Sequence, residues 1–211
     1  MVFHRHYAYH AGMRICFIGD SYVTGTGDET CQGWVGRLCA MERQAGYDVT
    51  PYNLGVRGQT SRDIAVRWHA ETRPRLAGRH DGGVVLSFGV NDCTATAHGP
   101  PRVPQDESIA TARGILQQAR QTWPVLVIGP TPVGRASPDD RTHALSHAMA
   151  DLCAQLDVPF LSVWNPLLAH PSWCAEIARG DGAHPAGGGY AALAGIIHGW
   201  PAWRKWMGPL P

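Results

Sequence analysis

The sequence has few charged residues and almost no excess of either sign. Charged side chains make up 17% of its 211 residues, and the formal net charge is +1. Surfaces that bind nucleic acid or anionic membranes need a clear basic excess, so we expect neither partner. The hydrophobic fraction, 44%, is ordinary for a globular protein and excludes a largely disordered chain.

Long hydrophobic runs are also missing. Apolar runs such as residues 84–86 and 125–128 are far shorter than the roughly 18 residues that a membrane-spanning helix needs. Residues 1–10 hold no apolar segment of the kind found in secretory signal peptides, which favours a cytoplasmic location. Without linkers, repeats or low-complexity tracts, the chain is expected to form one domain at residues 13–211, preceded by a lead-in at residues 1–12.

Spacings typical of disulfide or metal sites are absent. The six cysteines include no Cys-x-x-Cys pair, and we interpret them as reduced thiols that mostly fill the core. His143 and His147 have the i, i+4 spacing of a zinc motif. However, Ala144 stands where that motif needs a glutamate, so we expect no metal site.

Short apolar runs alternate with segments of helical periodicity. The expected strands cover residues 15–18, 47–54, 84–88, 125–128 and 159–163. The expected helices cover residues 33–46, 61–76 and 105–122, then 139 or 140 to 156, and a last one from 187 or 188 onward. This alternation predicts βαβ crossovers and a three-layer α/β/α fold around a parallel sheet.

Polar residues follow several of the expected strands, at the sheet edge where ligands bind in α/β folds. Ser21 comes directly after the first strand. A serine hydroxyl is a weak nucleophile and needs a base, most often histidine, whose imidazole a carboxylate orients. Asp181 and His184 are three residues apart in a Gly-rich loop, so one turn can bring the two side chains together. A developing oxyanion needs hydrogen-bond donors, which the N–H groups of Ser21 and Gly58 and the Asn91 amide can supply.

Four ordered blocks carry a resemblance to a known family. They are Gly19-Asp20-Ser21, Gly58, Gly89-Val90-Asn91-Asp92 and Asp181-Gly182-Ala183-His184. With these blocks the chain resembles the SGNH hydrolases, the GDSL-type esterases and lipases, from about residue 15 to 190. The resemblance implies a flavodoxin-like five-stranded parallel sheet of order 2-1-3-4-5, the SGNH hydrolase fold. It also implies a metal-independent enzyme without a cofactor.

The same resemblance assigns the site residues. It implies a catalytic triad of Ser21, His184 and Asp181, and an oxyanion hole formed by Ser21, Gly58 and Asn91. We choose Gly58 over Gly55 because the family's glycine lies just before the start of the second helix. Asp20 is interpreted as a residue that braces the loop, as is Asp92.

The predicted function is hydrolysis of a small carboxylic ester through an acyl-enzyme on Ser21. No lid-like apolar insertion is evident, which favours short to medium acyl chains. Two alternatives use the same scaffold, namely an acyltransferase or deacetylase acting on a sugar, and a binding module without catalysis. The absence of a Gly-x-Ser-x-Gly elbow argues against the ordinary α/β-hydrolase fold. Tryptophans at residues 200–206 could pack in the core or serve a homo-oligomer contact.

Overall fold

The computed structural model describes residues 12–78, 81–95, 99–134 and 136–209. Apart from Gly12, the expected lead-in lies outside these residues. A five-stranded parallel sheet of order β2-β1-β3-β4-β5 forms the centre of the molecule. Its strands are β1 (Met13–Gly19), β2 (Val49–Gly55), β3 (Gly82–Ser87), β4 (Val125–Ile128) and β5 (Phe160–Leu161). The α/β class and the strand order predicted from the sequence are thus confirmed.

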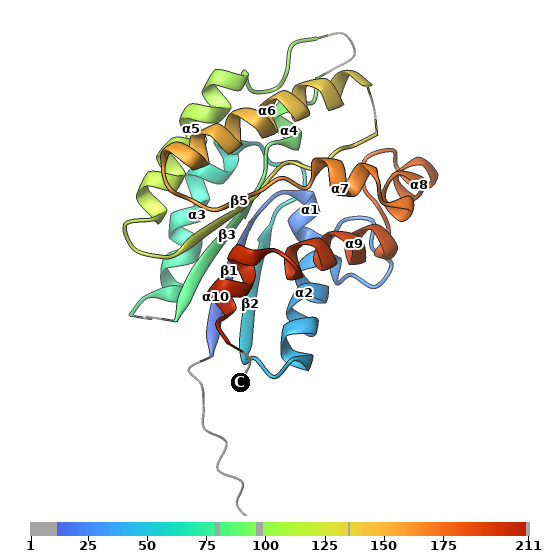
Figure 1. Cartoon of the computed structure of the whole chain (residues 1–211). Coiled ribbons are helices and arrows are strands. Elements are labelled where there is room, and N and C mark those ends of the chain that lie inside the picture. The colour runs from blue at the N-terminus through green and yellow to red at the C-terminus, as the bar shows by residue number, and fades with distance from the viewer. Residues whose placement is uncertain (1–11, 79–80, 96–98, 135, 210–211) are drawn as a thin grey trace, which may run out of the picture.

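Helices cover both faces of the sheet (Figure 1). One face carries α2 (Gly33–Gln44), α7 (Trp164–Leu168), α8 (Pro171–Arg179), α9 (Gly187–His198) and α10 (Pro201–Met207). The other face carries α3 (Ser61–Leu76), α5 (Gln105–Ala119) and α6 (Ala136–Gln155). Two one-turn helices, α1 (Ser21–Thr24) and α4 (Val90–Cys93), follow the ends of β1 and β3.

The strands are buried on both sides, which explains why they read as continuous apolar runs. Along β1, Ile15 and Phe17 belong to the core beneath α2 and α9, whereas Cys16 and Ile18 belong to the core beneath α3 and α5. Successive side chains of a strand point to opposite faces, so one run of four apolar residues supplies both cores. These cores hold β1 rigidly, and the residue after its end is therefore well placed.

Several element limits differ by a few residues from those expected. Helix α6 begins at Ala136 rather than at residue 139 or 140. This start places Pro138 in the first turn, where a proline is tolerated because its missing N–H would have no helical partner. Ser21 and Asn91 lie in one-turn helices rather than in loops. Both helices start directly at the carboxyl edge of the sheet, so the side chains remain at the expected place.

The C-terminal tryptophans pack within the chain. Trp203 on α10 is completely buried, with its ring 6.4 Å from that of Phe17 on β1 and 5.7 Å from that of Trp206. The core interpretation of this segment therefore holds for Trp203. Among the described helices, none is both long enough and apolar enough to cross a membrane.

Candidate active site

Ser21 lies where β1 gives way to α1. Asp20 caps this short helix, and its carboxylate accepts a hydrogen bond from the Tyr22 N–H at 3.0 Å. Gly19, the last residue of β1, has no room for a side chain, because a Cβ atom there would overlap the Ser87 carbonyl group on the neighbouring strand. The chain can therefore turn tightly and present Ser21 at the carboxyl edge of the sheet, where the residue is 3% exposed.

The predicted triad residues lie together. The Nε2 atom of His184 is 2.8 Å from the Oγ atom of Ser21. On its other side, the Nδ1 atom of His184 is 2.7 Å from the Oδ2 atom of Asp181. The histidine side chain is 11% exposed and the aspartate side chain 44% exposed, so the aspartate forms the outer end of the row.

The loop around Asp181 favours an ionised carboxylate. Its Oδ1 atom accepts hydrogen bonds from the N–H groups of Ala183 at 2.9 Å and His184 at 2.8 Å. Burial alone would raise the pKa of Asp181, but these bonds and the His184 imidazole lower it to about 2. Asp181 is therefore a carboxylate near neutral pH, and it can stabilise a positively charged imidazole. The guanidinium group of Arg57 lies 3.7 Å away, on the solvent side.

Gly58 occupies a turn that requires a glycine. Its φ angle is +78°, in the left-handed region, although a Cβ atom would meet no other atom within 4 Å. The Gly58 carbonyl oxygen accepts a hydrogen bond from Arg102 at 2.8 Å. The backbone N–H of Arg102 in turn donates to the carbonyl oxygen of Thr94, one residue beyond α4, at 2.9 Å. Arg102 thus ties the Gly58 turn to the helix that carries Asn91.

The Asn91 amide points toward the Ser21 segment. Its Nδ2 atom donates to the Gln59 carbonyl oxygen at 3.0 Å and to the Asp20 Oδ2 atom at 3.3 Å. The contact with Asp20 is the longer, and it places this amide beside the nucleophile segment. The expected bracing role of Asp20 agrees with its two contacts, which fix the Tyr22 N–H and the Asn91 side chain.

Asp92 braces the same region from below. It is completely buried and accepts hydrogen bonds from the Ser61 N–H at 2.7 Å and the Ser108 hydroxyl at 2.6 Å. These contacts join α4 to the starts of α3 and α5. Asp92 has no contact with the Ser21 or His184 side chains among the hydrogen bonds of the described residues, in agreement with its interpretation as a bracing residue.

A small cavity of about 90 Å³ opens beside Ser21. Its walls combine Ser21, His184 and Asn91 with mostly apolar groups. The lining residues are Ser21, Tyr22, Val90, Asn91, Thr94, Val133, Gly182, Ala183 and His184. No tryptophan lines this cavity, although Trp173 stacks behind the ring of Tyr22, with the ring centroids 6.2 Å apart.

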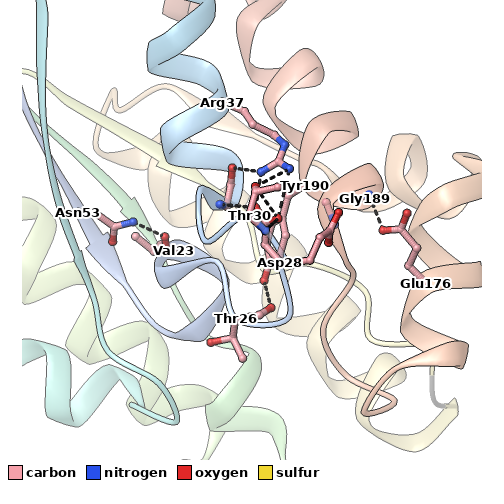
Figure 2. A network of polar contacts seen from close by, with 12 residues as sticks. Val23, Thr26, Asp28, Thr30, Arg37, Asn53, Glu176, Gly189 and Tyr190 are labelled. Atoms are coloured by element: carbon pink, nitrogen blue, oxygen red, sulfur yellow. Dashed lines mark hydrogen bonds and ion pairs between the residues drawn. The ribbon is translucent and has the colours of Figure 1, made fainter.

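A polar network supports the segment that follows Ser21 (Figure 2). Asp28 is buried and pairs with Arg37 on α2, and it accepts hydrogen bonds from the Gly33 N–H at 2.7 Å and the Thr30 N–H at 2.9 Å. Burial would raise the pKa of Asp28, but Arg37 and these donors lower it to about 2. Asn53 on β2 donates to the Val23 carbonyl oxygen at 2.8 Å. Together these contacts fix the loop between α1 and α2.

Other residues considered from the sequence lie elsewhere. The Nε2 atoms of His143 and His147 are 3.0 Å apart on α6, and these histidines do not line the cavity. Within the described ranges, no group of three or more His, Cys, Asp or Glu side chains is arranged to hold a metal ion. Cys93 is buried, and burial raises the pKa of its thiol to about 11, so it is a thiol rather than a thiolate.

Four neighbours of the site lie outside the four sequence blocks. They are Tyr22 and Thr94 in the cavity wall, Arg102 on the Gly58 turn and Val133 after β4. The contacts of Tyr22 and Arg102 join segments that are far apart in the chain, and no spacing or periodicity marks these residues. Tyr22 alone carried a signal, because it directly follows Ser21.

The sequence matches the GDSL-like Lipase/Acylhydrolase family over residues 17–192. Among curated proteins no match was found. The structure is similar to a lipase/acylhydrolase from Enterococcus faecalis, with 21% identity over 88% of this chain and 93% of the other, and a TM-score of 0.71. An acetylxylan esterase from Geobacillus stearothermophilus shares 18% identity over 91% of this chain and 96% of the other, with a TM-score of 0.73.

A lipolytic protein of the G-D-S-L family from Veillonella parvula is also similar, with 16% identity over 88% of this chain and 96% of its own, and a TM-score of 0.70. Further similar structures are alanine variants of the acetylxylan esterase at a serine, an aspartate and a histidine, each described as a catalytic mutant. At these identities the likeness shows a shared fold.

Proposed function

Because the chain belongs to the GDSL-like lipase/acylhydrolase family, we propose that it hydrolyses carboxylic esters through an acyl-enzyme on Ser21. The observation that carries this proposal is the unbroken row from the Ser21 hydroxyl through His184 to Asp181, with contacts of 2.8 Å and 2.7 Å. A nucleophile, a base within hydrogen-bond reach and a group that orients the base are what acyl transfer requires. Residues 13–211 are proposed to act as one domain.

In the first half-reaction, His184 Nε2 takes the proton of the Ser21 hydroxyl while its oxygen attacks the ester carbonyl carbon. The Asp181 carboxylate holds the Nδ1 proton and stabilises the imidazolium that forms. When the tetrahedral intermediate collapses, the imidazolium gives its proton to the departing alcohol. Water then attacks the acyl-enzyme with His184 as the base again, and the carboxylic acid leaves with Ser21 restored.

The oxyanion is proposed to lie between the N–H groups of Ser21 and Gly58 and the Asn91 amide. Gly58 has a positive φ angle and lies in the turn after β2. Arg102 holds its carbonyl oxygen by a hydrogen bond. The Asn91 amide lies against the Ser21 segment through Asp20 and against the Gly58 turn through Gln59. Loss of one donor of this kind typically lowers kcat by about 10²-fold to 10³-fold.

The cavity supports a short acyl group. Its volume of about 90 Å³ is small, so a short acyl chain is expected to fit better than a long one. Val90 and Val133 supply the apolar wall for such a chain.

A sugar ester is the alternative that a specific observation favours. One of the structural neighbours is an acetylxylan esterase, and the cavity here is of a size that suits an acetyl group. Deacetylation of a sugar and transfer of an acyl group to a sugar would use the same triad. Product analysis with an acetylated xylooligosaccharide, with and without an added acceptor sugar, separates hydrolysis from transfer.

The test of the proposed function replaces Ser21. We expect Ser21→Ala to lose at least 10³-fold in kcat toward 4-nitrophenyl acetate and to lose labelling by a fluorophosphonate probe. Ser172→Ala, which changes a half-buried serine on α8, serves as the matched control and should keep both signals. Undiminished turnover in Ser21→Ala would refute the mechanism. A wild-type protein that binds acetylated sugars but neither turns over nor takes the label would instead be a binding module.

A further inference from the structure

The residue after the proposed nucleophile contacts the residue before the proposed base. The hydroxyl group of Tyr22 donates a hydrogen bond to the carbonyl oxygen of Ala183 at 2.6 Å. The ring of the same tyrosine lies against the imidazole of His184, with 5.1 Å between the ring centroids. Tyr22 therefore touches both the backbone and the side chain of the segment that carries the base.

The surroundings of Tyr22 allow this hydroxyl little freedom. The residue is 3% exposed, and Trp173 on α8 also stacks on its ring, with 6.2 Å between the ring centroids. The indole N–H of Trp173 donates to the Pro132 carbonyl oxygen at 3.0 Å, which fixes this backing ring to the end of β4. Burial, and to a smaller extent the nearby Asp20 carboxyl group, raises the pKa of Tyr22 well above its ordinary value. The hydroxyl therefore keeps the proton that it donates.

A second tyrosine makes a similar contact in the opposite direction. Tyr190 on α9, six residues beyond His184, donates from its hydroxyl to the Thr26 carbonyl oxygen at 2.7 Å (Figure 2). Tyr22 thus reaches from the Ser21 segment to the His184 segment, and Tyr190 reaches back. Each bond joins a side chain of one segment to the backbone of the other. The Gly187 N–H, which donates to the Glu29 carboxylate at 3.0 Å, adds a third such bond farther from Ser21.

The distance between the two segments matters because they are separate in the chain and belong to different elements. Ser21 opens α1 after β1, whereas His184 lies in the loop between α8 and α9. A proton moves between Ser21 and His184 only while the two atoms stay within hydrogen-bond reach. A displacement of about 1 Å at such a site can lower the rate about 10²-fold.

We propose that Tyr22 is a positioning residue for the proposed reaction, whose hydroxyl holds the Ala183–His184 peptide and so keeps the imidazole in line with Ser21. Tyr190 supports the same alignment from the other segment. Tyr22 contacts the base and not the reacting ester atoms, so it acts through His184. The inference rests on the proposed function, because it assigns a task within the same site.

The chain offers a matched set of variants for the test. Tyr22→Phe removes the hydroxyl and keeps the ring against His184 and Trp173. Tyr47→Phe removes a hydroxyl with the same type of bond, since Tyr47 donates to the Gly208 carbonyl oxygen at 2.9 Å. Tyr47 precedes β2, at the opposite edge of the sheet from Ser21. Both changes leave a backbone carbonyl without its donor. Tyr47→Phe also removes the acceptor of a hydrogen bond from Arg204 at 3.2 Å, so urea denaturation should report a loss of stability at least as large as that of Tyr22→Phe.

The activities should differ. For 4-nitrophenyl acetate we expect Tyr22→Phe to lower kcat about tenfold with KM changed less than twofold, and to slow covalent labelling by the fluorophosphonate in parallel. Tyr190→Phe should lower both rates by a smaller factor, and Tyr47→Phe should leave both within twofold of the wild type. Equal kcat in Tyr22→Phe and Tyr47→Phe would overturn the inference, as would a rise in KM without a fall in kcat.

Failure of this inference can be told apart from failure of the proposed function. If Ser21→Ala abolishes turnover while Tyr22→Phe behaves like Tyr47→Phe, the esterase mechanism stands and the positioning role is wrong. If Ser21→Ala retains full turnover, the proposed mechanism is wrong, and the positioning role that depends on it falls too.

Discussion

Asp20 lies in a position that should make the stability of the protein depend on pH. It is 1% exposed, and its oxygens accept hydrogen bonds from the Tyr22 N–H and the Asn91 amide. Burial and the nearby Asp92 carboxyl group raise the pKa of Asp20 from 3.8 to about 7, against the effect of those hydrogen bonds. The folded protein therefore holds a proton on Asp20 at pH values where the unfolded chain releases it.

The magnitude follows from the size of this pKa difference. Each pKa unit corresponds to about 1.4 kcal/mol, so the rise from 3.8 to about 7 is equivalent to about 4 kcal/mol. Because the folded pKa is the higher one, this stability is fully present below about pH 4 and is lost as the pH rises through about 7. Of the total, about 3 kcal/mol should be lost between pH 5 and pH 9.

Asp20→Asn removes the titration and keeps the shape of the side chain. The new amide faces the Asn91 amide, so the variant should lose about 1 kcal/mol of unfolding free energy at all pH values. Its unfolding free energy should stay nearly constant above pH 5, whereas that of the wild type falls. Urea denaturation at pH 5, 7 and 9 measures this, and we expect the wild type to lose about 3 kcal/mol more than the variant between pH 5 and pH 9.

A second aspartate provides the control. Asp63 accepts hydrogen bonds from the backbone N–H and hydroxyl of Thr60, which lower its pKa below the ordinary value. It is already ionised at pH 5, so Asp63→Asn should give a curve parallel to that of the wild type above this pH. If the Asp20→Asn curve is also parallel, the carboxyl group does not carry the raised pKa, and the reasoning is refuted.

Three further predictions follow from named contacts. Val133→Ala removes two methyl groups from the cavity wall. In a series of 4-nitrophenyl esters, the preferred acyl chain should become about one to two carbons longer. An unchanged optimum would contradict the assignment of this cavity to the acyl group. Gly58→Ala places a side chain at φ +78°. It should lower the unfolding free energy, measured by urea denaturation, by about 1–2 kcal/mol and lower kcat about tenfold. Full kcat would argue against Gly58 as an oxyanion donor. Glu42→Gln removes the charge of a completely buried carboxylate that pairs with Arg204 and accepts a hydrogen bond from the Trp203 N–H. The unfolding free energy should fall by about 3 kcal/mol, while kcat at 25 °C stays within twofold. A loss below about 0.5 kcal/mol would show that this pair contributes little.

The fold could be predicted from the sequence because each strand carries its own signal. Residues 15–18 and 125–128 are apolar throughout, since both faces of a central parallel strand are buried. Strand β5 was expected at residues 159–163 but pairs only at Phe160–Leu161. It is an edge strand with partly exposed residues, so fewer positions are constrained and its limits are harder to predict.

The candidate site was predictable to the same degree, and for a related reason. Parallel strands bring all their carboxyl ends to one edge, so Ser21 and Asn91, which follow β1 and β3, must lie near each other. Asp181 and His184 do not follow a strand directly. Their place came from the resemblance and from the short turn between them, whereas the Tyr22 hydroxyl that contacts this loop at Ala183 carries no such signal.

Contacts of the kind made by Tyr22 and Arg102 lie beyond what the sequence pattern can indicate. The Tyr22–Ala183 bond spans 161 positions and the Arg102–Gly58 bond 44 positions. Each bond depends on the position that a hydroxyl or guanidinium group takes after the whole chain has packed. A tyrosine after a serine, or an arginine in a loop, is compatible with many such positions, and no periodicity distinguishes among them.

This difference also bears on which ester the protein accepts. In the proposed mechanism the four sequence blocks supply the groups that touch the ester carbonyl, and a common carbonyl chemistry needs little variation in them. The acyl chain is instead proposed to meet Val90 and Val133, and only the first of these belongs to a block. If so, substrate choice can change through Val133 while the proposed triad and oxyanion donors stay the same. For this reason a change at Val133 should alter the chain-length profile much more than the rate with an acetyl ester.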